Sequence, residues 1–129
     1  MKIKEFNSAL VQQGFVLEEN GSLTGEIDGI KIMVRGRHDS FDDVHNFSIY
    51  YDDEPEINLS ESIAEKLDKT LNSELHKYDS NFHGSVSNDV IVGYIGNKQF
   101  LQTLQADAVY DYILFFVSKL KMIVQEINK

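Results

Sequence analysis

Two tight-turn dipeptides, Asn20-Gly21 and Asp28-Gly29, constrain the fold of this chain more than any other feature of its sequence. Each dipeptide favours the positive φ angles that both central positions of a two-residue type I′ hairpin turn require. Apolar residues alternate with polar ones between the two turns and again after the second one. The pattern predicts a three-stranded antiparallel meander.

Three amphipathic segments predict helices. Residues 2–13 carry apolar side chains at spacings of three and four, and Gly14 follows, which suits the end of a helix. Residues 60–78 carry a narrow apolar stripe, and residues 106–127 form a longer and more apolar segment. The stripe of the middle helix consists of Ile63, Leu67, Leu71, Leu75 and Tyr78.

Further extended segments are expected at 46–51, 82–86 and 90–95, where apolar residues recur between turn-forming ones. Residues 98–104 fit either a first helical turn or a short extended piece. We therefore expect residues 1–129 to form a single α+β domain. An antiparallel sheet of about five to six strands would pack with three helices, in the chain order α-β-β-β-β-α-β-β-α.

The last helix is apolar around most of its circumference, so more than one element must cover it. One interpretation is a central helix packed between the sheet and another helix. Another is a homodimer interface formed by residues outside the core of one protomer, because a single core is not expected to cover both Phe115 and Phe116. A third is a groove along the helix that holds a cofactor. The candidate interface residues are Tyr112, Phe115 and Met122.

Composition excludes several classes of function. The chain has no cysteine, which rules out disulfides, thiolate metal sites and cysteine nucleophiles. Its net charge of −9 argues against binding to nucleic acid or to an anionic membrane. The N-terminus lacks the apolar run of a secretory signal, and no apolar run could span a bilayer. We expect a cytoplasmic protein without a cofactor.

One loop gathers potential metal ligands, with His38, Asp39, Asp42, Asp43 and His45 inside eight residues. Imidazole and carboxylate groups can hold a divalent cation. Consecutive loop residues rarely converge on one point, however, and helical His-x-x-x-His spacing is absent. We therefore expect a solvated loop and no metal site.

Other catalytic patterns are absent or weak. No nucleophile motif or phosphate-binding loop occurs in the sequence. His76, His83 and Asp79 could form an acid–base unit, but surface histidines at the end of a helix are the commoner explanation. We expect no catalytic residue, and the chain is predicted not to be an enzyme.

Charge is concentrated in residues 38–65, which we call the acidic segment. It contains nine carboxylates and no lysine or arginine, whereas the rest of the chain holds twelve acids and twelve bases. Charge confined in this way can steer a basic protein partner, or can simply keep the surface soluble. The candidate partner-binding residues are Asp42, Asp43, Asp52, Asp53, Glu54 and Glu56.

The predicted order of elements resembles that of the small acidic chaperones of type III secretion. The resemblance rests on the first helix with Gly14, the meander with its Asn20-Gly21 and Asp28-Gly29 turns, the middle helix and the long last helix. It implies an α+β homodimer that binds unfolded segments of effector proteins without catalysis. The expected strand at 46–51 departs from that pattern, and no binding residue can be carried over individually.

Three hypotheses follow. The first is a non-enzymatic acidic protein-binding module of the chaperone or immunity-protein kind, acting as a dimer. The second is a metal-dependent hydrolase that uses the His38–His45 loop, and the third is a structural or phage-encoded accessory protein without a ligand. The concentrated negative charge and the lack of a catalytic motif favour the first hypothesis.

Overall fold

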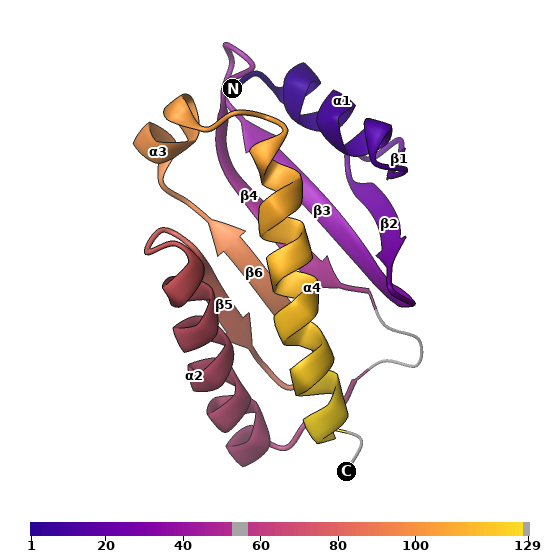
Figure 1. Ribbon diagram of the computed structural model, residues 1–129, viewed down its shortest axis with the longest axis vertical. Coiled ribbons are helices and arrows are strands. Elements are labelled where there is room, and N and C mark those ends of the chain that lie inside the picture. The colour runs from indigo at the N-terminus through magenta and orange to yellow at the C-terminus, as the bar shows by residue number, and fades with distance from the viewer. Residues whose placement is uncertain (53–56, 128–129) are drawn as a thin grey trace.

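The computed structural model describes residues 1–52 and 57–127, which form six strands and four helices (Figure 1). The strands are β1 (Val16–Leu17), β2 (Leu23–Ile27), β3 (Ile30–His38), β4 (Val44–Tyr51), β5 (His83–Val86) and β6 (Ile91–Ile95). The helices are α1 (Ile3–Gln12), α2 (Glu61–Tyr78), α3 (Lys98–Thr103) and α4 (Ala108–Ile127). The strands make one antiparallel sheet in the order β1-β2-β3-β4-β6-β5, which confirms the predicted α+β fold class and element order.

The two predicted turns differ in the structure. Asp28 and Gly29 have φ angles of 53° and 81°, and Ile27 pairs directly with Ile30, so a two-residue turn joins β2 to β3 as expected. The first turn was predicted wrongly as a tight turn at Asn20-Gly21. Residues 18–22 form a longer connection between β1 and β2, in which the side chain of Asn20 accepts a hydrogen bond from the backbone of Ser22.

Side-chain caps define where two of the helices begin. The Ser60 hydroxyl accepts a hydrogen bond from the backbone of Ile63 at the start of α2. Asn97 caps α3 in the same way, through the backbone of Phe100, at 3.1 Å. Residues 98–104, which fitted two structures in the sequence, are therefore mostly helical, and α3 is an addition to the three predicted helices.

The helices lie on one face of the sheet. Figure 1 shows α4 running across the strands between α1 and α2, and α4 contacts both helices as well as β4. The apolar residues of α4 that face the sheet are completely buried, including Ile113, Phe116 and Leu120. They pack with Phe47 and Ile49 of β4 in one hydrophobic core. The opposite face of the sheet carries no helix in the part of the chain that the structure describes.

A glycine in β6 lets α4 approach the sheet closely. A Cβ atom at Gly93 would lie only 2.8 Å from Cδ2 of Phe116, and 3.2 Å from a ring atom of Phe82. The Phe116 ring therefore occupies the space that a side chain would take. Within residues 1–52 and 57–127, no helix is long and apolar enough to cross a membrane.

Both edges of the sheet are protected against pairing with another strand. One edge is β1, which has only two residues. At the other edge, Asn72 Oδ1 accepts from the backbone N–H of Gly84 at 3.0 Å, and Asp68 Oδ1 accepts from that of Val86 at 2.7 Å. Side chains of α2 thus satisfy outward-facing donors of β5, the groups that an added strand would use.

Candidate functional site

The main candidate site is an apolar groove between the first half of α2 and the last turns of α4, which we call the α2/α4 groove. Its volume is about 520 Å³. Ile63 and Met122 stand at its surface with exposed fractions of 49% and 53%. The groove is lined by Ile63, Lys66, Leu67, Thr70, Met122, Ile123, Gln125 and Glu126.

The groove exists because α2 buries fewer of its apolar residues than the sequence predicted. Ala64, Leu67, Leu71 and Leu75 point into the core, whereas Ile63 lies outside it. On α4, Ile123 is buried and its neighbour Met122 is exposed. The two helices therefore close over the sheet but leave apolar side chains on their outer rims. The exposed apolar pair beside this hollow makes the groove a candidate for binding a partner.

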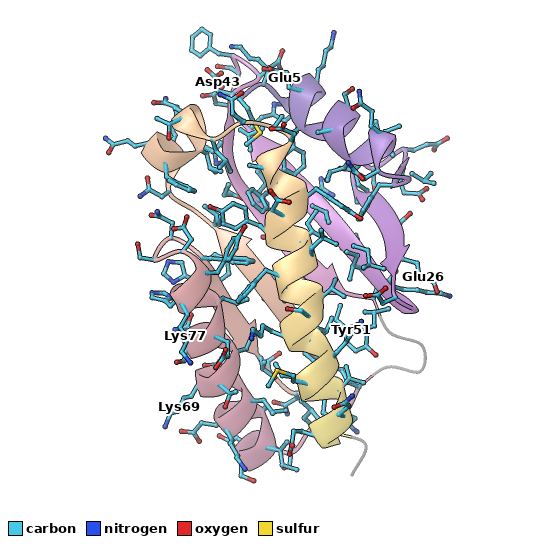
Figure 2. The ribbon with its side chains drawn as sticks, viewed as in Figure 1. Glu5, Glu26, Asp43, Tyr51, Lys69 and Lys77 are labelled. Carbon is cyan, nitrogen blue, oxygen red and sulfur yellow. The ribbon has the colours of Figure 1, made fainter. Side chains whose placement is uncertain are left out.

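The groove also has charged groups on its rim. Lys66 and Glu126 lie in its walls, and Glu65 and Lys69 line an adjoining hollow with Lys66. Figure 2 shows Lys69 at the outer side of α2, away from the sheet. A binding segment would therefore meet an apolar floor with acidic and basic groups at its borders.

The three predicted dimer residues lie in very different environments. Tyr112 is inside the protomer core, with an exposed fraction of 5%, and Phe115 is half-buried with its ring stacked on Tyr78 at 4.6 Å. Only Met122 is exposed. Phe116 is fully buried, whereas Phe115 is only partly covered by its own protomer. The dimer itself stays a prediction.

The pKa of Tyr112 is strongly raised. Burial raises the pKa of its phenol, and the neighbouring Asp79 carboxylate raises it further. Burial also raises the pKa of Asp79, but hydrogen bonds from Tyr112 and Asn81 outweigh that effect, and the net shift is downward. This pair serves the packing of α4 against α2 and lies away from the groove.

The structure separates the two halves of the acidic segment. Asp42 and Asp43 precede β4, and Asp52 follows it, so about 25 Å of strand lies between them. Figure 2 places Asp43 at the end near the N-terminus and Tyr51 toward the other end. The predicted binding residues Asp53, Glu54 and Glu56 lie outside the described residues.

Lysines distant in sequence neutralise the loop half of the acidic segment. Lys2 Nζ lies 3.0 Å from Asp43 Oδ1, and Lys98 Nζ lies 3.1 Å from Asp39 Oδ2. The hydrogen bond to Asp43 raises the pKa of Lys2. Partial burial raises the pKa of Asp39, but backbone donors of Phe41 and Asp43 together with Lys98 produce a net decrease. The loop carboxylates are therefore less available to a partner than the sequence suggested.

The potential metal ligands do not converge. Asp39 Oδ1 accepts hydrogen bonds from the backbone of Phe41 and Asp43, so it holds the loop together. Asp42 lies 3.6 Å from the ring of His38. Among the described residues, no group of three histidines and carboxylates is placed to hold a metal ion.

The other candidate acid–base unit is not assembled either. The rings of His76 and His83 lie 4.7 Å apart at an angle of 64°. Within the described part of the chain, the hydrogen bonds of Asp79 go to Tyr112 and Asn81 and to neither histidine. His76 and His83 therefore pack as aromatic rings and do not form a proton-transfer chain with Asp79 in this structure.

Sequence reasoning missed the groove because it counted Ile63 in the buried stripe. Ile63 and Ala64 both lie at helical spacing from Leu67, so spacing alone does not decide which of them faces the core. Met122 was singled out from the sequence, and the structure places it beside the hollow.

Comparison with protein-family models, with curated proteins and with solved structures found no match for this chain.

Proposed function

We propose that this chain is a non-enzymatic protein-binding module that takes an amphipathic, basic segment of a partner protein into the α2/α4 groove. The observation that carries the proposal is the exposure of Ile63 and Met122 beside a hollow of about 520 Å³. Amphipathic helices commonly bind by placing spaced apolar side chains in such grooves.

Apolar contact supplies the affinity in this proposal. Burying the exposed parts of Ile63 and Met122 removes apolar surface from water, which contributes about 25 cal/mol per Å² before the entropic cost of association. Leu67 and Ile123 form the deeper, buried part of the lining and give the groove a fixed shape.

Charge selects the partner. The chain carries a net charge of −9, and the end of the acidic segment that reaches α2 includes Glu61 and Glu65. Neither carboxylate forms an ion pair with another described residue. A negative field at this end of the molecule accelerates the approach of a basic segment. The role of Asp43 is smaller in this proposal, because Lys2 forms an ion pair with it.

Chaperones of secreted proteins and immunity proteins are both modules of this type, and homodimerisation stays part of the proposal. A second copy of the chain is the competing occupant of the groove, because Met122 is the predicted dimer residue that remains exposed. The two occupants are distinguished by the molar mass in solution of the unaltered protein and of Ile63→Asp/Met122→Asp. A dimer that these substitutions dissociate occupies the groove itself, whereas a dimer that survives them forms elsewhere and leaves the groove to a partner.

The test is affinity capture from native lysate with the full chain as bait, followed by quantitative mass spectrometry. The baits are the unaltered protein, Ile63→Asp/Met122→Asp, and the control Val11→Asp, which changes an exposed apolar residue on α1. We expect a basic protein that is lost with the groove variant and retained with the control. Retention of every captured protein by the groove variant would contradict the proposal, as would a groove-dependent dimer that captures no protein.

A further inference from the structure

The uncovered face of the sheet carries both arginines of the chain. Arg35 and Arg37 are the only arginines in the sequence, and both are exposed on β3. Ile32 and Val34 alternate with them in sequence and are completely buried against the helices. The two guanidinium groups therefore share the open face, with their Cα atoms about 7 Å apart.

Neither arginine has a partner among the described residues. Five lysines form ion pairs with carboxylates: Lys2, Lys77, Lys98, Lys119 and Lys121. Arginine is the better residue for bidentate binding of a carboxylate or phosphate. The side chains of Arg35 and Arg37 nevertheless make no hydrogen bond or ion pair within residues 1–52 and 57–127. The two guanidinium groups are therefore available to bind an anion on this face of the sheet.

An irregularity in β4 brings a third donor to the same place. Arg37 pairs with Asn46 and His38 pairs with Val44, so His45 is an extra residue in the β4 strand. The side-chain nitrogen of Asn46 lies 2.9 Å from His45 Nδ1. This contact engages Nδ1, and Nε2 has no hydrogen-bond partner among the described residues. Nε2 can therefore donate to a ligand when it carries the ring proton.

These side chains surround a hollow without a carboxylate. The hollow has a volume of about 360 Å³ and is lined by Arg35, Gly36, Arg37, His38 and His45. His38 is turned toward the acidic loop, with Nδ1 at 3.1 Å from the backbone oxygen of Asp39. The lining therefore offers two guanidinium groups and an imidazole donor to a ligand, and no side-chain acceptor that would repel an anion.

We propose that Arg35, Arg37 and His45 form a binding site for a phosphate monoester. A phosphate monoester carries a charge between −1.5 and −2 and three acceptor oxygens, which match two guanidinium forks and one N–H donor better than a single carboxylate does. The phosphate can belong to a small organic molecule or to a phosphorylated side chain of another protein. This site lies on the sheet face opposite the helices and does not depend on the α2/α4 groove.

The test is an NMR titration of the full, uniformly ¹⁵N-labelled chain at constant ionic strength. The two probes are phenyl phosphate, for the small-molecule source, and a phosphoserine peptide, for the protein source. We expect saturable shifts confined to the backbone amides of residues 35–37 and 45–46. The probe that binds more tightly identifies the source.

The variants decide whether the arginines hold the phosphate. Arg35→Gln/Arg37→Gln should weaken binding at least tenfold, which corresponds to about 1.4 kcal/mol. Arg37→Lys should weaken it less, because the charge remains while the fork is lost. The control Lys66→Gln/Lys69→Gln removes the same charge from α2 and should leave the affinity unchanged. Absence of saturation with both probes, or equal weakening by both double variants, would overturn the proposal.

Discussion

The phenol oxygen of Tyr112 donates a hydrogen bond of 2.6 Å to Asp79 Oδ2. Tyr112 is on α4, and Asp79 is the residue at which α2 ends, so this bond joins the two helices that flank the α2/α4 groove. Asp79 also accepts from the backbone and side chain of Asn81, at 2.8 and 3.0 Å. The relative position of α2 and α4 is thus fixed by this polar contact at one end, by an ion pair between Lys119 of α4 and Glu74 of α2 at 3.3 Å, and by apolar packing.

The first prediction concerns this contact. Tyr112→Phe should lower the free energy of unfolding by about 1.5 kcal/mol at pH 7, since it removes a hydrogen bond to an ionised carboxylate. The matched control is Tyr110→Phe, because the Tyr110 hydroxyl has no hydrogen-bond partner among the described residues. Urea denaturation of both variants measures the difference, and equal effects would contradict the assignment.

The same contact predicts a pH dependence. The pKa of Asp79 is lowered in the folded protein, because the hydrogen bonds outweigh the opposing effect of burial. A group of this kind stabilises the fold above its unfolded pKa of about 3.9, and the contribution is lost as the pH falls through the folded value. The difference between the unaltered protein and Tyr112→Phe should therefore be full at neutral pH and smaller at acidic pH. A constant difference would contradict this account.

The second prediction concerns the β5 edge. Asp68→Ala and Asn72→Ala should each lower the free energy of unfolding by about 1 kcal/mol, because Val86 and Gly84 lose acceptors for their backbone N–H groups. The double variant should also self-associate on concentration, since the edge becomes free to pair. Lys69→Ala on the same helix is the control, and light scattering detects the association. A double variant that stays monodisperse and stable would refute the proposed protection.

The third prediction concerns the close approach of α4 to β6. Gly93→Ala should lower the free energy of unfolding by about 1–3 kcal/mol, because its Cβ would lie 2.8 Å from Phe116. Gly96→Ala is the matched control, since a Cβ there meets no heavy atom within 4 Å. Urea denaturation should separate the two variants clearly. Similar midpoints would show that the Phe116 ring can move aside.

Local signals in the sequence predicted most of the fold. The Asp28-Gly29 turn was correct because the register of its flanking strands matches a two-residue connection. Asn20-Gly21 has the same preference for a tight turn, but Leu17 pairs with Leu23, which requires a longer connection. A dipeptide indicates that the chain turns, whereas the pairing register decides the length of the turn.

The candidate sites were less predictable, because they depend on which distant residues meet. Nothing near Asp43 in the sequence indicated that Lys2 would neutralise it, or that Lys98 would pair with Asp39. The burial of Tyr112 depends on aromatic neighbours that are distant in the sequence, among them Phe47 of β4 and Phe82, which precedes β5. Counting charges along the sequence therefore overestimated how many unpaired carboxylates the loop exposes. The apolar pattern of the last helix likewise overestimated how many of its apolar side chains are exposed.

The fourth prediction compares the two halves of the acidic segment. Asp52→Asn/Asp53→Asn/Glu54→Gln should slow association with the captured partner severalfold at low salt, with little change in fold stability. Asp42→Asn/Asp43→Asn should slow it less, because Lys2 already forms an ion pair with Asp43. Both effects should fade as salt shortens the Debye length from about 10 Å at 0.1 M to about 3 Å at 1 M. Equal association rates for all three proteins at low salt would mean that the acidic segment serves solubility alone.

The most direct measurement of the central claim is the dissociation rate of the captured partner segment from the immobilised full chain. Ile63→Asp/Met122→Asp should raise that rate at least tenfold, because the apolar contacts of the groove determine how long the complex lasts. Val11→Asp, which places the same charge on an exposed site of α1, should leave the rate unchanged. A groove variant that releases the segment as slowly as the unaltered protein would contradict the assignment of the α2/α4 groove as the binding site.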